Sequence, residues 1–198
     1  IKTMGKLLFT SESVSNGHPD KVADQISDQI LDKYLEKDEN SRVAVETFLT
    51  GNTILIGGEV TSKHKFSLEE IRKIVKNKLV EIGYKDDESG LNPEKVEILV
   101  KLSEQSSEIA DGVFNALEKR EGSVDSLDAQ GAGDQGIMFG FACNDNTSYF
   151  PIAGRLAHLL MEEHAKLRKQ EDCILLPDAK SQVTIEYFDN SPVRIDNI

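Results

Sequence analysis

Few cysteines, no long apolar run and a shortage of positive charge limit what this 198-residue chain can be. The two cysteines, Cys143 and Cys173, suggest neither a disulfide framework nor a zinc site by number or spacing, so we expect free thiols. No apolar run approaches the roughly 20 residues that a membrane helix needs, and no signal peptide is visible. These absences predict a cytoplasmic protein without a membrane partner.

The charge balance argues against nucleic acid as a partner. The chain has 23 Lys and Arg against 35 Asp and Glu, a formal net charge of −12. Nonspecific binding to nucleic acid or to anionic membranes is therefore disfavoured. An anionic substrate would need local basic side chains or a divalent cation. With 38% hydrophobic residues, the chain can still form a packed core.

Hydrophobic periodicity predicts an α+β fold. The first half is expected to contain a strand at 5–9, a loop at 10–19, a helix from Asp20, a hairpin of strands at 42–50 and 53–60, a helix from the capping box at 67–70 to Gly83, and a strand at 95–102. This order predicts βαββαβ-type units, in which mixed or antiparallel sheets carry helices on one face.

The second half predicts an incomplete repeat of the same architecture. We expect a buried strand at 137–144, a helix at 152–169, a strand at 181–188 and the start of another at 193–195. More than 30 residues before it have little apolar periodicity, which favours a mobile lid over a passive connection. The expected divisions are a first domain at 5–103, a mobile loop with a glycine loop at 104–135, and a partial second domain at 136–198.

A glycine loop at 131–136 (GAGDQG) is the most informative single stretch. Three glycines in six residues let the backbone approach a ligand closely, because no Cβ stands in the way. Asp134 adds one negative charge to it. The spacing fits neither phosphate-loop fingerprint. The loop by itself leaves two alternatives open, a small-molecule site or a tight surface turn.

His18, Pro19 and Asp20 stand where the predicted loop meets the predicted helix. Pro19 is rigid, and Asp20 suits the positive end of the helix dipole. The pair can supply a hydrogen-bond donor and a metal ligand. The alternative is that Asp20 only caps the helix and His18 is incidental.

Two further pairs of charged residues can each be interpreted as parts of a ligand site or as ordinary solvated side chains. Glu46 and Glu59 each lie in an apolar strand, where a carboxylate on a packed face is unfavourable unless it is paired or binds a cation. Asp178 and Lys180 stand two residues apart at a strand entrance, where Lys180 can bind phosphate and Asp178 a hydroxyl or amine group. The alternative in each case is a solvated side chain.

Taken together, these segments resemble one family. The chain resembles the S-adenosylmethionine synthetases (methionine adenosyltransferases) in five segments that occur in the family's order: SESVS followed by GHPDK at 11–21, VAVETFLTG at 43–51, IGGEVT at 56–61, the glycine loop running into MFGFA at 131–142, and DAKSQV at 178–183. The resemblance runs from Gly5 to the end of the chain, and its first segment and glycine loop are highly specific.

The resemblance implies that the methionine sulfur attacks the 5′ carbon of ATP and expels triphosphate, which is then cut to phosphate and pyrophosphate. It also implies two Mg²⁺ per site and a K⁺. By residue, it implies charge stabilisation by His18, Mg²⁺ binding by Asp20, K⁺ binding by Glu46, methionine contacts by Glu59, Gln105 and Asp134, and ATP contacts by His18, Asp134, Asp178, Ala179 and Lys180, with His18 and Lys180 catalytic.

One departure from the family is large. The family has three similar domains, and this sequence matches the first and part of the second. Each family site also draws on two subunits, within a homodimer or homotetramer. We therefore expect a fragment with little activity by itself. The alternative is a noncatalytic module that keeps nucleotide or partner binding.

Overall fold

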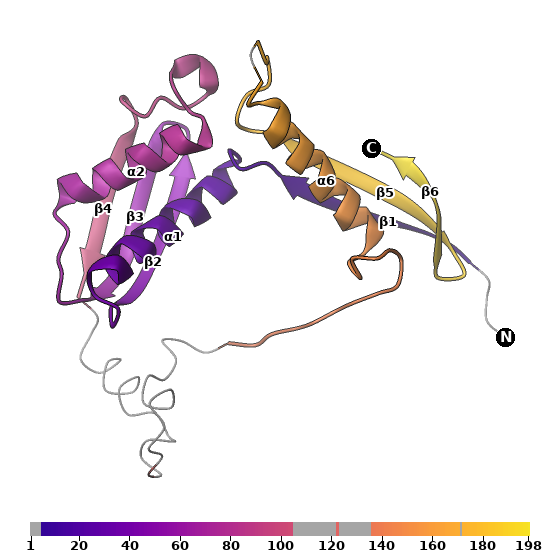
Figure 1. Ribbon diagram of the computed structural model, residues 1–198, viewed down its shortest axis with the longest axis horizontal. Helices are drawn as coiled ribbons and strands as arrows, with labels where there is room; N and C mark the ends of the chain where they lie inside the picture. Colours follow the sequence, from indigo (N-terminus) through magenta and orange to yellow (C-terminus); the bar gives the residue numbers. More distant parts are fainter. Residues whose placement is uncertain (1–4, 105–121, 123–135, 171) are drawn as a thin grey trace. The chain divides into compact units, whose positions relative to one another are not determined.

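The computed structural model describes residues 5–104, 122, 136–170 and 172–198. The chain divides into two compact units, one of residues 1–22, 79–96 and 139–198 and the other of residues 23–78 and 97–138. Each is built around its own three-stranded sheet (Figure 1). Among the described residues, no helix is both long and apolar enough to cross a bilayer.

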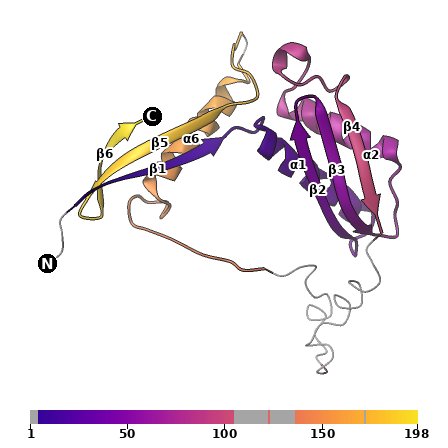
Figure 2. The same ribbon diagram turned by 180° about the vertical axis from the view of Figure 1, so that it is seen from behind.

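The first sheet has the order β2-β3-β4. Strands β2 (Arg42–Thr50) and β3 (Thr53–Thr61) form an antiparallel hairpin, as predicted, and Gly51 adopts a φ of 52° in its two-residue turn. Strand β4 (Glu97–Ser103) pairs parallel to β3. Helices α1 (Pro19–Lys37) and α2 (Leu68–Ile82) lie along the same face of this sheet, as the two views of Figures 1 and 2 show.

Alternation along the strands explains how this layer forms. Inward-facing strand residues and one stripe of each helix are buried; they include Val45, Ile54, Ile56, Val60 and Ile98 from the sheet and Ile26, Ile30, Ile71 and Val75 from the helices. The predicted capping box is confirmed, since Ser67 N donates to Glu70 Oε2 at 2.8 Å and Glu70 N donates to Ser67 Oγ at 3.3 Å.

The second sheet joins the two ends of the chain. Its order is β1 (Lys6–Val14), β5 (Lys180–Phe188) and β6 (Ser191–Asn197), and both pairings are antiparallel. Helix α6 (Ile152–Leu167) covers it through Ala153 and Ala157, which pack against Val183 and Ile185. A short 3₁₀ helix, η1 (Asp87–Ser89), precedes β4 along the chain. Both cysteines are free.

The prediction for the first strand was wrong in two respects. We expected a strand at 5–9, a loop from Thr10 and a place in the sheet of the first half. Strand β1 instead continues to Val14 and pairs with β5. Nine residue pairs, from Lys6 with Phe188 to Val14 with Lys180, extend the ladder through the polar residues 10–14, which have no local strand pattern. A long-range ladder therefore overrides local polarity here.

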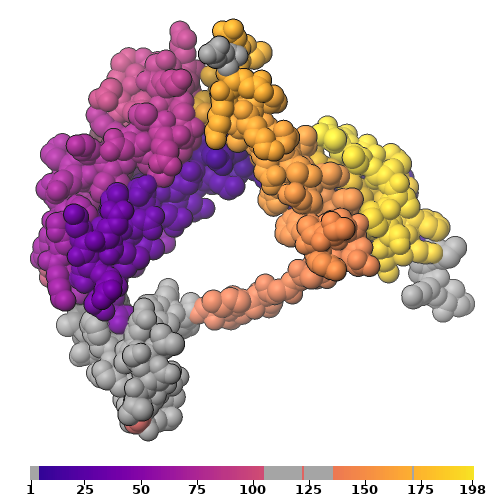
Figure 3. Space-filling view, viewed as in Figure 1, coloured from indigo at the N-terminus to yellow at the C-terminus, as the bar shows by residue number. Residues whose placement is uncertain are grey.

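The predicted buried strand at 137–144 was also wrong. Residues 136–143 have no regular secondary structure, and the apolar side chains there are exposed, Phe139 to 95%. Figure 3 shows this stretch as a thin extended segment. An apolar run indicates that a segment needs a covering partner but does not identify it. No strand of the described residues pairs with this segment.

Glu186 provides a test of the second sheet. Its carboxylate contacts Lys6 Nζ at 2.9 Å and Arg194 at 2.7 Å, on the two neighbouring strands. The hydrogen bond from Lys6, aided by Arg194, lowers the pKa of Glu186. The resulting stabilisation is present above the unfolded pKa of about 4.3 and is lost as the pH falls through the lower folded value.

We therefore expect Glu186→Gln to lower the urea midpoint at pH 7, and the difference from wild type to narrow progressively as the pH falls below about 4.3. Circular dichroism at several pH values measures both. Glu39→Gln, at an exposed glutamate, is the control and should leave the pH dependence unchanged. A constant difference across this range would show that the ion pairs do not stabilise the sheet.

Candidate functional site

Two predicted site segments meet near the end of β1, the start of α1 and the start of β5. Ser15 N donates to Ala179 O at 2.9 Å, and Ala179 N donates to Ser15 Oγ at 2.8 Å. The two segments also touch at Gly17, where a Cβ would lie only 2.5 Å from atoms of Pro177. The structure thus brings the His18–Asp20 and Asp178–Lys180 segments together, although about 160 residues separate them in sequence.

His18 caps helix α1. Its Nδ1 accepts a hydrogen bond from Asp20 N at 3.2 Å. In the neutral imidazole the proton therefore lies on Nε2, which remains a donor for a ligand. The alternative that Asp20 is the helix cap is wrong, because Asp20 is the second residue of the helix and its side chain is 91% exposed. The carboxylate of Asp20 is 3.8 Å from His18 Nδ1.

Lys180 has a partner that the sequence did not indicate. Its Nζ forms an ion pair with Glu12 Oε1 at 2.8 Å, and both side chains are about half exposed. Because Lys180 pairs in register with Val14, Glu12 lies two residues away on the same face of the sheet. The ammonium group is thus held at the sheet surface by a carboxylate that an anionic ligand can replace.

The buried Tyr84 supports the turn before His18. Its hydroxyl donates to Gly17 O. Burial raises the pKa of Tyr84 to about 12, and the negative charge of Asp178 acts in the same direction. The phenol therefore stays protonated and keeps its role as a donor at every physiological pH. Asp178 itself is exposed.

Glu46 and Glu59 lie in the other unit, on the face of the β2-β3-β4 sheet that carries no helix. Glu46 pairs with Gly57 and Glu59 pairs with Ala44, so the two carboxylates share this face. Glu46 is exposed, and Gly57 leaves room beside it, since a Cβ there would meet only Lys101 O at 3.9 Å. Of the two interpretations, the solvated side chain fits Glu46 in the described structure, whereas Glu59 is half-buried.

The donor chemistry of these residues fits the expected cations only in part. Mg²⁺ is commonly bound by one or two carboxylates and by substrate phosphates, and the exposed Asp20 can supply such a ligand. Glu46 can supply one oxygen ligand for K⁺. Within the described part of the chain, no group of three His, Cys, Asp or Glu side chains is arranged to hold a metal. Ligands beyond these carboxylates must come from elsewhere.

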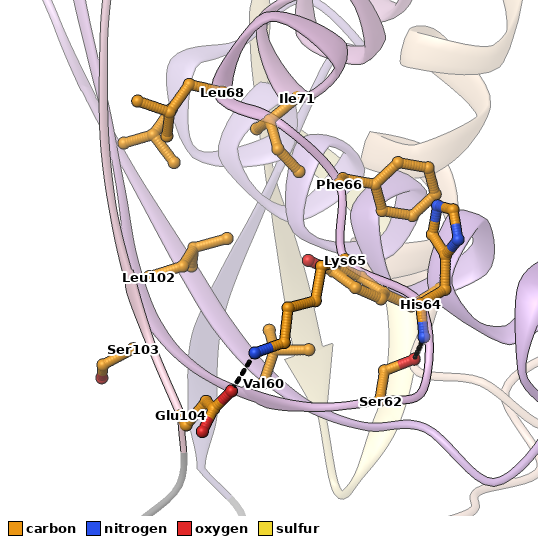
Figure 4. Close-up of a pocket in the computed structure, with 12 residues that line it drawn as sticks. Val60, Ser62, His64, Lys65, Phe66, Leu68, Ile71, Leu102, Ser103 and Glu104 are labelled. Atoms are coloured by element: carbon orange, nitrogen blue, oxygen red, sulfur yellow. Dashed lines mark hydrogen bonds and ion pairs between the residues drawn. The ribbon is translucent and has the colours of Figure 1, made fainter.

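A cavity of about 230 Å³ lies in the unit of the β2-β3-β4 sheet and contains none of the predicted site residues (Figure 4). Lys65 and Glu104 at its edge pair with each other, which raises the pKa of Lys65 and lowers that of Glu104. His64 N donates to Ser62 Oγ at 3.2 Å. These bonds use the side chains of Lys65 and Glu104 and the backbone amide of His64, whereas the buried Nε2 of His64 has no hydrogen-bond partner among the described residues.

Gln105 and Asp134 lie outside the described residues, as do all of the predicted lid except Glu104 and Gly122 and all of the glycine loop before Gly136. The predictions for these residues stay predictions.

Comparison with known proteins decides the family. Residues 6–107 match the S-adenosylmethionine synthetase N-terminal domain, and residues 129–198 match the central domain of the same enzyme. The chain belongs to the S-adenosylmethionine synthetase family. The α+β fold, with mixed and antiparallel sheets that carry helices on one face, agrees with this assignment.

Individual relatives agree with it. The chain is 52% identical over 193 residues to the S-adenosylmethionine synthase of Lacticaseibacillus casei (strain BL23), and 47% identical to those of a Nocardioides species and of Clostridium tetani. Each alignment covers 96% of this chain and 48% of the relative. The chain thus spans about half the length of these synthetase relatives.

Sequence reasoning missed Glu12, Ser15 and Tyr84 as parts of the junction. Glu12 and Ser15 stand in a polar run that we interpreted as a loop, and no local pattern indicates that they face β5. Tyr84 follows the helix-ending Gly83 and gives no signal of its partner. Only the pairing of β1 with β5 could have identified the first two.

Gly17→Ala tests the close approach at this junction. The added Cβ would clash with the backbone of Pro177, which cannot move without displacing Asp178. Overpacking of this kind costs about 1–3 kcal/mol, which urea unfolding measures. Gly140→Ala is the matched control, because a Cβ there meets nothing within 4 Å. Equal stability of the two variants would contradict the described contact.

Proposed function

We propose that this chain is the N-terminal and central part of a methionine adenosyltransferase, which converts ATP, L-methionine and water into S-adenosylmethionine, phosphate and pyrophosphate. The observation that supports it most is the junction that joins His18 and Asp20 to Asp178 and Lys180. The name of the relatives, S-adenosylmethionine synthase, indicates the reaction. The proposal also keeps the predicted domain boundaries, with a first domain at 5–103, a loop at 104–135 and a partial second domain at 136–198. It includes a cytoplasmic location.

His18 has a definite task in this proposal. Attack of the methionine sulfur on the 5′ carbon leaves negative charge on the departing triphosphate. The Nε2–H of His18 is free to donate to that oxygen, because Nδ1 is already used by Asp20 N. The cap also fixes the ring orientation before the ligand arrives, so the donor needs little reorganisation.

Lys180 and Asp178 bind ATP in the same proposal. Lys180 exchanges Glu12 for a phosphate oxygen, and the more highly charged phosphate makes the stronger partner. Asp178 accepts from a hydroxyl or amine group of the nucleotide, and the backbone of Ala179 is fixed beside it. Mg²⁺, bound through Asp20, would neutralise charge on the triphosphate, and K⁺ would bind at Glu46. Glu59, Gln105 and Asp134 remain the proposed methionine contacts.

The second candidate function is a noncatalytic binding module of synthetase origin. The half-length match to the relatives favours it. The presence of His18 beside Lys180 favours the enzyme, because a module that only binds nucleotide needs Lys180 but has no use for a donor to the leaving triphosphate.

A chimaera distinguishes the two functions. We expect the 198-residue chain alone to form little S-adenosylmethionine from ATP, methionine, Mg²⁺ and K⁺. Joined to the part of the Lacticaseibacillus casei relative that it does not cover, it should become active, because the missing basic and metal-binding groups are then supplied. Product formation is measured by chromatography, with the intact relative as the control.

Within that chimaera, His18→Asn should lower kcat about 100-fold or more while ATP binding is retained, as expected when a donor to a developing oxyanion is lost. Lys180→Met should weaken ATP binding about tenfold or more. A folded chimaera that binds ATP but makes no product would support the noncatalytic module instead.

A row of exposed apolar side chains supports the proposed self-association into a homodimer or homotetramer. Phe48 pairs across the sheet with Leu55, which pairs with Leu99, all on the face without helices. Phe48 is 63% exposed, and the other two are partly exposed. An adjacent apolar row of this kind is typical of an interaction surface.

Phe48→Glu should therefore shift the chain towards the monomer, because burying a carboxylate at the interface is unfavourable. Sedimentation velocity over a concentration series measures the shift. Val80→Glu, at an exposed apolar residue of α2, should leave association unchanged. A wild-type chain that stays monomeric at every concentration would exclude this surface as an interface of the isolated chain.

A further inference from the structure

The hydroxyl of Ser15 forms two hydrogen bonds with the turn that carries Asp178. It donates to Pro177 O at 2.7 Å and accepts from Ala179 N at 2.8 Å. These two groups flank Asp178 on either side. Ser15 is 2% exposed, so water does not replace the bonds if the hydroxyl is removed.

The backbone of Ser15 extends the connection to the helix start. Its carbonyl accepts from His18 N at 3.1 Å, and its amide donates to Ala179 O at 2.9 Å. One residue thus contacts both the segment that presents His18 and the segment that presents Asp178 and Lys180. The two segments are far apart in the sequence, so their alignment depends on noncovalent contacts of this kind.

Gly17 and Tyr84 limit how else the two segments can sit. Gly17 packs directly against Pro177, and the Tyr84 hydroxyl donates to the Gly17 carbonyl. With the turn constrained by these contacts, loss of the Ser15 hydroxyl releases chiefly the segment around Asp178. The change is therefore local to one side of the junction.

We propose that Ser15 is a positioning residue of the nucleotide site, whose hydroxyl fixes Asp178 and Lys180 relative to His18. This inference rests on the proposed function, since it takes ATP to be the ligand. Ser15 itself touches no ligand in this role. It acts through the backbone of Pro177 and Ala179, so its effect on ATP binding depends on the side chains that this turn presents.

A matched pair of serines separates positioning from general stability. Ser13 is also buried on the same segment, but its Oγ bonds His158 Nδ1 at 2.7 Å and not the turn. Ser13→Ala and Ser15→Ala each remove one buried hydroxyl. We expect both to lower the urea midpoint, and only Ser15→Ala to weaken binding of Mg·ATP by the 198-residue chain, by about tenfold.

The experiment combines calorimetric titration of Mg·ATP with amide hydrogen exchange. In wild type the Ala179 amide should be protected, and Ser15→Ala should remove that protection while Ser13→Ala retains it. In the Lys180→Met background, Ser15→Ala should cause much less further loss of ATP affinity, because it acts partly through Lys180. Ser15→Cys keeps the volume but has a poor donor and acceptor, and it replaces Ser15→Ala if that variant does not fold.

Four results would overturn the inference: wild-type ATP affinity in the Ser15 variant, equal loss of affinity in Ser13→Ala, unchanged Ala179 protection, or a full additional tenfold loss of affinity in the Lys180→Met background. Failure of the wild-type chain to bind Mg·ATP would instead contradict nucleotide binding in the proposed function. The exchange data still show in that case whether Ser15 holds the turn.

Discussion

The antiparallel ladder between β1 and β5 is the constraint on which the candidate site depends. It pairs residues 6–14 with residues 180–188 without an interruption. Because the ladder ends where α1 begins and where the Asp178 turn ends, it sets His18 and Lys180 at one junction. Bringing two strands so far apart in sequence together is entropically unfavourable. The nine residue pairs of the ladder, together with the packing of α6 on Val183 and Ile185, offset this loss.

The junction bears on how an acidic chain could bind the proposed ligand, ATP, which is also anionic. The net charge of −12 gives no general attraction for ATP. Binding of the proposed nucleotide would therefore depend on local groups that are in place before it arrives. The hydrogen bond from Asp20 N to His18 Nδ1 leaves the proton of the neutral imidazole on Nε2. The ion pair with Glu12 holds Lys180 at the sheet surface. Preorganised groups of this kind lose little entropy when they bind.

Several apolar side chains of the described structure are exposed to solvent. Phe48, Leu55 and Leu99 form a row on a sheet face without helices, and Phe139 is almost fully exposed. The sequence predicted a buried strand at 137–144 from this apolar run, and that prediction was wrong for the described residues. A local apolar pattern does not say which other segment, if any, covers it.

The sequence by itself determined the local elements whose signals are local. The hairpin around Gly51, the capping box at Ser67 and the helices α1, α2 and α6 follow from turn chemistry and 3.6-residue periodicity. The motifs also identified the family and its candidate residues, including His18 and Lys180. Only the tertiary structure decided that β1 belongs with β5, that His18 caps the helix, and that Glu12, Ser15 and Tyr84 complete the junction. The physical reason is that strand pairing joins residues far apart in sequence, and no short-range pattern encodes the partner of a backbone hydrogen bond.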